Sequence, residues 1–192
     1  KNLLQSTSAQ SATKLESIQS LWSGYGQIIR MELQGASMHT VVVKNVILPS
    51  QHKHPRGWNT DKSHQRKVKS YAVEMEFYKH FSIYCNDDCR VAKCYSVFSH
   101  ENERLIVLED LDAASFPVRK SHLDRREVMT CLKWLAEFHA TFLNRKPEGL
   151  WDVGTYWHLA TRPDELAAMK NSELKEMAST LDEMLNNCRF KT

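Results

Sequence analysis

The chain has 192 residues, a length that fits one domain or an unequal pair of lobes with a core of their own. Hydrophobic residues make up 42% of it and charged residues 26%, which excludes a disordered, collagenous or coiled-coil protein. The net charge of +3 is small, and acidic residues are interspersed among the basic ones. We therefore expect no nucleic-acid partner.

Nothing in the sequence suggests a membrane protein. No stretch approaches 18 uninterrupted apolar residues, and residues 1–14 are polar and lack the apolar core of a signal peptide. We expect a soluble, cytoplasmic protein without a membrane partner. The five cysteines fit this compartment, because an odd number in a chain of this length is typical of free thiols.

Three of the cysteines, Cys85, Cys89 and Cys94, lie close together in the sequence. Their spacing differs from that of zinc motifs, and no fourth ligand is obvious nearby. Residues 86–88 between the first two are typical of a turn. We expect no metal site in this segment.

The first half of the chain is rich in strand patterns. Three of the six glycines fall between residues 24 and 35, on either side of the apolar run 28–33. Because glycine adopts positive φ in turns, this predicts two strands joined by tight turns. The β-branched run 40–48, ended by Pro49, predicts the next strand.

A polar loop at residues 50–63 precedes a change of apolar spacing to three and four, which predicts an amphipathic helix over 67–81. Residues 91–98 and 104–108 predict two more strands, so the order is β, β, β, α, β, β. The second half predicts a long helix over 124–143, a helix that begins near Thr161, and a last one over 172–185.

These elements predict an α+β fold with two lobes. A polar N-terminal segment at 1–14 precedes a small antiparallel-sheet lobe with one helix at 15–108. A connection at 109–116 leads into the start of a helical lobe at 117–192.

One lysine and one glutamate in the small lobe suggest phosphate chemistry. Kinase-like phosphotransferases hold ATP with a lysine on the third strand, whose ammonium is oriented by a carboxylate on the next helix. Lys44 follows three valines, and Glu74 lies on the apolar side of the predicted helix, whereas Glu76 is rotated about 200° away. We therefore expect Lys44 to pair with Glu74, although each residue alone is typical of a solvated surface.

Four segments resemble the choline kinase and aminoglycoside phosphotransferase superfamily. They are Val41 to Lys44, Val73 to Tyr78, Leu105 to Leu111 and Leu135 to Ala140. Their E-x-x-F-Y, L-E-D-L and A-x-F-H-A patterns most resemble the ecdysteroid-kinase-like branch, over about residues 15–145. The tracts 57–61 and 154–163 resemble an uncharacterised subgroup whose substrate cannot be named. The resemblance implies a protein-kinase-like fold.

The resemblance also implies an ATP site in the small lobe. In it the glycine-containing hairpin faces the phosphates, the lysine contacts them, and the segment after the last strand acts as a hinge that binds adenine through main-chain groups. The implied residues are Ser23, Gly24, Tyr25 and Gly26 in the hairpin, Lys44 and Glu74, and Glu109, Asp110 and Leu111 in the hinge. The alternatives are a plain hairpin turn at 23–26 and a solvated acidic turn after residue 108.

The acceptor would be a small molecule with a hydroxyl group, which the sequence does not identify. Weak candidates for its binding are Trp157, His158, Arg162 and Asp164. The same residues also fit packing and capping at a helix start.

The family's catalytic motif, H-G-D followed by an asparagine, does not occur in the sequence. The only similar triplet ends at Asp124, but Met129 occupies the position of the metal-binding asparagine, and Asp124 fits a helix cap better. We expect the 192 residues alone to lack phosphotransferase activity, with Mg²⁺ bound only if a catalytic part follows. The long helix should then expose its apolar face around Trp134, Phe138 and Phe142 and promote aggregation.

Three interpretations follow. The first is an ATP-dependent small-molecule kinase of which this chain holds the small lobe, and the second is a non-catalytic kinase-like module that binds nucleotide or a partner. The third is an unrelated α+β protein whose aromatic segment around Trp151, Tyr156 and Trp157 binds another ligand. The intact mass of the natural gene product would separate the first two.

Overall fold

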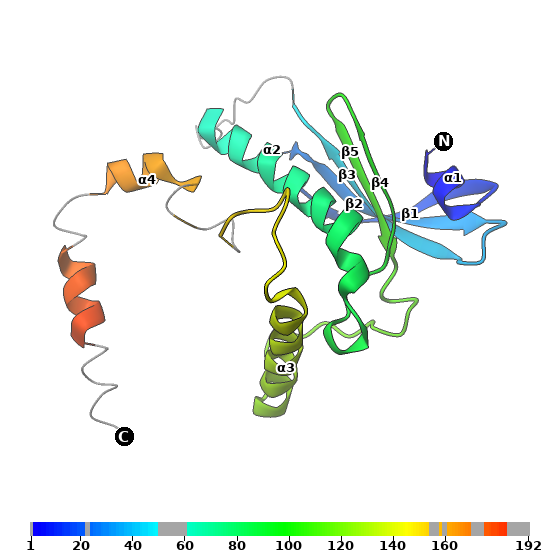
Figure 1. The fold of residues 1–192 in the computed structure, drawn as a ribbon. Helices are drawn as coiled ribbons and strands as arrows, with labels where there is room; N and C mark the ends of the chain where they lie inside the picture. The colour runs from blue at the N-terminus through cyan, green and yellow to red at the C-terminus, as the bar shows by residue number, and fades with distance from the viewer. Residues whose placement is uncertain are drawn as a thin grey trace. The chain divides into compact units, whose positions relative to one another are not determined.

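The computed structural model describes residues 2–21, 24–49, 61–153, 158, 161–169 and 175–183. The chain divides into two compact units, Lys1–Leu150 and Trp151–Thr192, which are described separately below. The first unit holds the sheet and its covering helices (Figure 1).

Five antiparallel strands form one sheet in the order β1-β2-β3-β5-β4. Hairpins connect β1 to β2, β2 to β3 and β4 to β5, and α2 lies in the connection from β3 to β4. The central strand β3 is the β-branched run of the sequence, which suits a strand buried between two others. The strands are β1 (Ser11–Ser20), β2 (Gly26–Gln34), β3 (Thr40–Ile47), β4 (Cys94–His100) and β5 (Glu103–Glu109).

The two faces of the sheet carry different helices. Side chains alternate along a strand, so Val41 and Val43 point to one face and Lys44 to the other. The two valines are buried in a hydrophobic cluster that also holds Leu3 and Leu4 of α1 (Asn2–Thr7). Lys44 meets helix α2 (Asp61–Glu76), and α1 and α2 lie on either side of the sheet in Figure 1.

Helix α2 does not end in an ordinary α-helical turn. It continues into a π-helical turn, η2 (Phe77–Phe81), and then a 3₁₀ turn, η3 (Ser82–Tyr84). A second 3₁₀ turn, η4 (Asp87–Cys89), is capped by Asn86, whose side chain accepts hydrogen bonds from two backbone N–H groups. The helix predicted over 67–81 is therefore present, but it begins six residues earlier, at Asp61.

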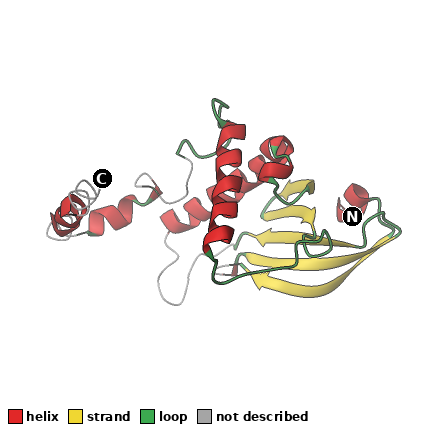
Figure 2. Ribbon diagram, turned by 90° about the horizontal axis from the view of Figure 1, so that it is seen from below, coloured by secondary structure: helices red, strands yellow, loops and turns green. Residues whose placement is uncertain are grey.

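Helix α3 (Arg125–Phe142) begins with a reciprocal capping box. The Asp124 carboxylate accepts a hydrogen bond from the Glu127 N–H at 2.9 Å, and the Glu127 carboxylate accepts one from the Asp124 N–H at 3.0 Å. The prediction that Asp124 is a helix cap is confirmed. Figure 2 shows this long helix beside the sheet.

Aromatic side chains join α3 to the π-helical turn. Phe138 lies 6.1 Å from Phe77 between ring centroids, Phe142 lies 6.4 Å from Phe81, and Trp134 stacks on Phe138 at 5.2 Å. The expectation that Trp134, Phe138 and Phe142 form the exposed face is therefore wrong. The exposed apolar side chains of α3 are Val128, Met129, Leu132 and Leu135.

In the second unit, the described residues contain α4 (Pro163–Ala168) and a helical segment at 175–183. Both coincide with predicted helices. Trp151 and His158 approach edge to face, with ring centroids 6.1 Å apart.

The predicted α+β class is confirmed by the five-stranded antiparallel sheet and its helices. The segment 1–14, which the sequence pattern describes only as polar, contains α1 and the first residues of β1. No helix within the described residues is long and apolar enough to cross a membrane.

Candidate functional site

Lys44 and Glu74 form an ion pair on the face of the sheet that carries α2. Lys44 Nζ lies 2.8 Å from Oε1 and 2.6 Å from Oε2 of Glu74, so it donates to both carboxylate oxygens. Their side chains are 15% and 32% exposed, which leaves the pair open to a ligand from one side. The Tyr71 ring lies 5.3 Å from the ammonium. Glu76 instead faces His80, and its Oε2 lies 3.4 Å from Nε2 of that histidine.

The side chains around Lys44 on this face are apolar. Ile28 is its partner on β2 and Ile106 its partner on β5, while Val42 and Leu108 form the next pair toward the end of β5. Ile106 is buried, whereas Ile28, Val42 and Leu108 are only partly covered. A cation at the edge of a partly open apolar surface is suited to a ligand with an anionic group and a flat apolar ring.

The hairpin between β1 and β2 needs its glycines for backbone reasons. Gly24 adopts φ +75° with open space around it, whereas Gly26 adopts φ +125° and a Cβ there would lie 2.1 Å from the Asn45 carbonyl oxygen. The Leu21 N–H donates to the Gly26 carbonyl at 2.8 Å and closes the turn. Ser23 lies outside the described residues.

Tyr25 fastens this hairpin to α2. The side chain is completely buried, and its Oη lies 2.6 Å from Nδ1 of His64. Its ring lies 6.0 Å from Tyr71 and 4.8 Å from the Lys67 ammonium. The side chain of Tyr25 therefore links the hairpin to the helix that supplies Glu74.

The predicted hinge residues are held by side-chain contacts. The Glu109 carboxylate accepts a hydrogen bond from Arg90 at 2.7 Å and one from the Lys93 N–H at 3.1 Å. Asp110 is 5% exposed and accepts hydrogen bonds from Arg30 at 2.7 and 3.2 Å. A solvated acidic turn is therefore the wrong description of Asp110. Leu111, in contrast, is 37% exposed.

Several main-chain groups of this segment also have partners. The Glu109 N–H donates to the Lys93 carbonyl at 2.8 Å. The carbonyls of Asp110 and Leu111 accept hydrogen bonds from the N–H groups of residues 114 and 116, at 3.0 and 2.8 Å. Each carbonyl oxygen keeps a second lone pair for another donor.

Arg30 is the residue that sequence reasoning missed. Besides Asp110 it contacts Glu16 on β1 and Asp112 at 2.5 Å, and Asp112 also pairs with Arg119 at 2.7 Å. The hydrogen bond with Asp110 raises the pKa of Arg30, and the hydrogen bonds from Arg119 and Arg30 lower the pKa of Asp112. The one signal in the sequence is a charged residue inside the apolar run 28–33.

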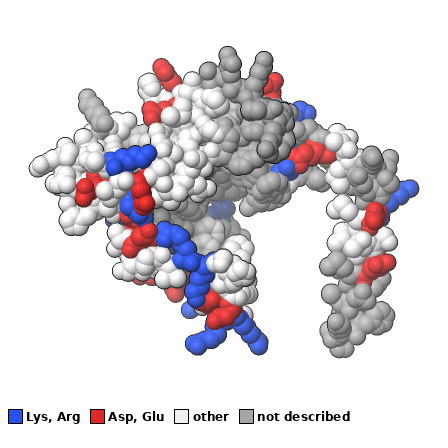
Figure 3. Space-filling view, turned by 180° about the vertical axis from the view of Figure 1, so that it is seen from behind, with Lys and Arg blue, Asp and Glu red and all other residues white. Residues whose placement is uncertain are grey.

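Basic and acidic atoms are interspersed in the same way on the face of the molecule shown in Figure 3. Blue and red groups adjoin one another along this face, and the described atoms there form no broad region of one sign.

The acceptor-side candidates lie in the second unit. Arg162 pairs with Glu165 within the first turn of α4, the geometry of a helix start. His158 contacts the Trp151 ring. Trp157 and the side chain of Asp164 lie outside the described residues.

The described residues contain no group of three His, Cys, Asp or Glu side chains that could hold a metal ion. Cys85, Cys89 and Cys94 are free thiols, as is Cys131.

The comparison with known families agrees with the geometry of the small lobe. The model of the ecdysteroid kinase-like family matches residues 26–188, which is most of the chain. The chain belongs to the ecdysteroid kinase-like family. At the level of the family this indicates a kinase-like phosphotransferase. No curated protein matches the sequence significantly.

Proposed function

We propose that this ecdysteroid kinase-like chain binds ATP in its small lobe for phosphoryl transfer to a hydroxyl group of a small molecule. The observation that carries the proposal is the ion pair between Lys44 and Glu74, with Lys44 Nζ 2.6 and 2.8 Å from the two carboxylate oxygens. A lysine fixed in this way presents its positive charge at one position, which is what binding of the ATP phosphates requires.

The other residues of the small lobe have roles that follow from their positions. The hairpin at 23–26 would cover the phosphates with its backbone, and Tyr25 and His64 keep it against α2. Ile28, Val42 and Leu108 would contact the adenine ring, and main-chain groups of residues 109–111 would hydrogen-bond its edge. ATP supplies the transferable γ-phosphoryl group.

The proposal assigns no catalytic base and no Mg²⁺ ligand. The H-G-D motif does not occur in the sequence, and the described residues form no acidic cluster for a metal. The second candidate is a kinase-like module that binds a nucleotide or a partner without catalysis. Both candidates share the nucleotide site at Lys44.

We further propose that an acceptor, if one binds, contacts the second unit through Trp157, His158, Arg162 or Asp164. The pairing of Arg162 with Glu165 speaks for a structural role of that arginine. The cytoplasm remains our proposed compartment, since the four cysteines within the described residues are free thiols.

The proposal is tested by calorimetric titration of the chain with ATP. Lys44→Met should weaken ATP binding by about tenfold to a hundredfold, the loss expected for one charge-assisted hydrogen bond. Lys133→Met, on the exposed side of α3, is the matched control and should bind like the wild type. Equal affinities of the wild type and Lys44→Met would contradict the proposed site.

The two candidates are separated by a second measurement. Release or transfer of the γ-phosphoryl group, followed with Mg²⁺ and a panel of small alcohols, is expected from a kinase and not from a binding module. Tight ATP binding without any turnover would leave the binding module as the function of this chain.

A further inference from the structure

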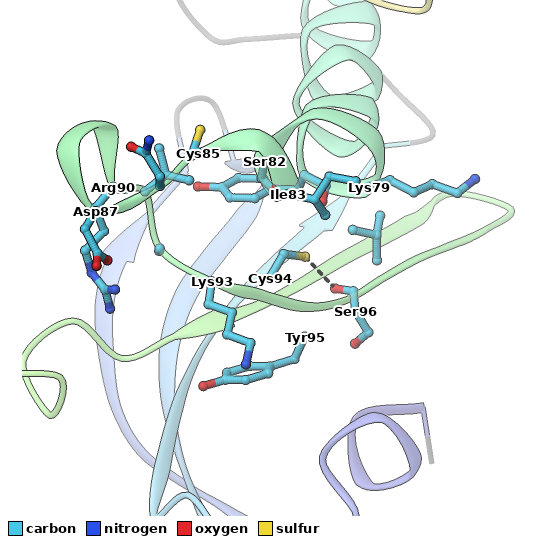
Figure 4. Close-up of a pocket in the computed structure, with 15 residues that line it drawn as sticks. Lys79, Ser82, Ile83, Cys85, Asp87, Arg90, Lys93, Cys94, Tyr95 and Ser96 are labelled. Carbon is cyan, nitrogen blue, oxygen red and sulfur yellow. Dashed lines mark hydrogen bonds between the residues drawn. The ribbon is translucent and has the colours of Figure 1, made fainter. Parts of the chain in front are cut away.

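A cavity lies beside the turns that follow helix α2, and neither Lys44 nor Glu74 lines it. It has a volume of about 520 Å³ and is bounded by the π-helical turn η2, the 3₁₀ turns η3 and η4, and edge strand β4. Figure 4 shows Ile83 on the helical side and Cys94 on the strand side, with the cavity between them. This volume falls in the range of sites for small organic molecules.

The cavity lining mixes apolar side chains with polar groups that are neutral. Burial raises the pKa of Tyr78 to about 12, and it raises the pKa of Cys85 to about 11. Burial raises the pKa of the Cys94 thiol as well. These groups are therefore uncharged near neutral pH, and they lie beside Ile83 and Val97. An apolar ligand body would meet a neutral surface here.

Positive charge gathers at the rim. Lys79, Arg90 and Lys93 line the cavity, against the single acidic residue Asp87. Arg90 is neutralised by Glu109 at 2.7 Å, but within the described part of the chain no carboxylate lies at ion-pair distance from either lysine. The Lys93 ammonium lies over the Tyr95 ring at 5.7 Å. The rim thus offers two cations to an anion.

Two buried polar atoms of the lining lack a partner among the described residues. They are Nε of Arg90 and Oγ of Ser96. A buried donor without a hydrogen bond is uncommon in native proteins and calls for an explanation, such as a water molecule or a ligand that completes it. Both groups are hydrogen-bond donors.

The cavity wall is also formed by the π-helical turn. Tyr78 belongs to η2, where the hydrogen-bond pattern departs from that of an α-helix. Such turns are rare and occur frequently at functional sites. The turn, the unpartnered donors and the charge at the rim are independent observations on the same cavity.

We propose that this cavity is a second ligand site, separate from the nucleotide site, and that it binds a small carboxylate with an apolar body. The apolar body would lie between Ile83, Cys94 and Val97, and the carboxylate would lie at the rim beside Lys93. Because neither Lys44 nor Glu74 lines the cavity, this proposal can be tested separately from the proposed ATP binding.

The probe for the test is 4-phenylbutyrate, with its amide and the corresponding amine as uncharged and cationic controls. Binding is followed by chemical-shift changes in two-dimensional NMR spectra of the chain. The carboxylate should bind, the amide should bind about tenfold more weakly, and the amine should not bind. Ala92→Trp, which fills the cavity, should abolish binding, whereas Lys133→Glu on α3 should leave it unchanged.

Binding that persists in Ala92→Trp would overturn the proposal, because the probe would then occupy another apolar surface. Equal binding of the carboxylate, the amide and the amine would overturn it too. If Ala92→Trp does not fold, the double variant Lys79→Glu and Lys93→Glu replaces it and should reduce affinity at least about tenfold. In a Cys131→Ser background, the probe should also slow alkylation of Cys85 and Cys94, and unchanged rates at saturating probe would again contradict the site.

Discussion

The choice between Glu74 and Glu76 shows how much a single position on a helix decides. Both are glutamates two residues apart, but Glu74 contacts Lys44 and Glu76 faces His80. Glu74→Gln should weaken ATP binding by about tenfold or less, because the neutral amide still accepts one hydrogen bond from the ammonium. Glu76→Gln is the matched control and should bind ATP like the wild type in the same titration. A larger loss in Glu76→Gln than in Glu74→Gln would contradict the assignment.

Tyr78 gives a test in the alkaline range. Its pKa is raised to about 12 mainly by burial, and an ordinary tyrosine has a value of 10. A neutral phenol that resists ionisation stabilises the folded chain fully below pH 10, and this contribution is lost as the pH rises from 10 to about 12. Absorbance at 295 nm should show an ionisation step near the pKa of about 12 that is missing in Tyr78→Phe.

Loss of the late step in the wild type, with folding retained by circular dichroism, would show that the phenol is open to solvent. The burial that raises the pKa of Tyr78 requires the opposite.

The contrast between Lys44 and Arg30 shows which site residues a sequence can reveal. Lys44 and Glu74 could be paired from the sequence because their strand and helix fit the arrangement of kinase-like phosphotransferases, and helical spacing selected Glu74 over Glu76. Arg30 contacts Asp110, which is 80 residues away in the chain, and Tyr25 contacts His64, which is 39 residues away. Such pairs depend on how the strands and α2 come together in the fold, and no spacing within one segment encodes them.

At the scale of elements, strong periodicity determined which segments could be predicted. Strand β3 buries alternate apolar residues, and helix α3 has apolar residues at helical spacing. Both elements lie close to their predicted bounds. Strand β1 is an edge strand with nearly all side chains exposed, so it lacks the alternation that marks a half-buried strand. Its position comes from pairing with β2 rather than from a pattern of its own.

The capping box of α3 can be tested directly. Asp124→Ala removes the acceptor for the Glu127 N–H and should lower the free energy of unfolding by about 1 kcal/mol. Asp124→Ser keeps an acceptor at the cap and should recover most of this loss. Urea denaturation followed by circular dichroism measures both variants. No difference between alanine and serine would mean that the cap does not stabilise the folded chain.

At the scale of the whole molecule, helix α3 presents apolar side chains on two sides. The side with the aromatic residues faces the π-helical turn. About a quarter of a turn away from it, Val128, Leu132 and Leu135 form an apolar stripe, and these side chains are 40%, 50% and 40% exposed. A contiguous exposed apolar stripe of this kind favours self-association. The sequence predicted exposed apolar surface on this helix but placed it on the wrong side, because the π-helical turn and its phenylalanines were not predicted.

A charged substitution in the stripe tests whether the stripe causes self-association. Leu132→Lys should reduce self-association of the chain, seen as a lower sedimentation coefficient at high concentration, because a charge at the centre of the stripe must be desolvated in any contact. ATP affinity should not change, since Leu132 is absent from the described contacts of Lys44 and Glu74. Val118→Lys is the matched control: Val118 is 74% exposed but lies outside the helix and should leave self-association as it is. If both variants dissolve the assemblies equally, general surface charge and not the α3 stripe controls them.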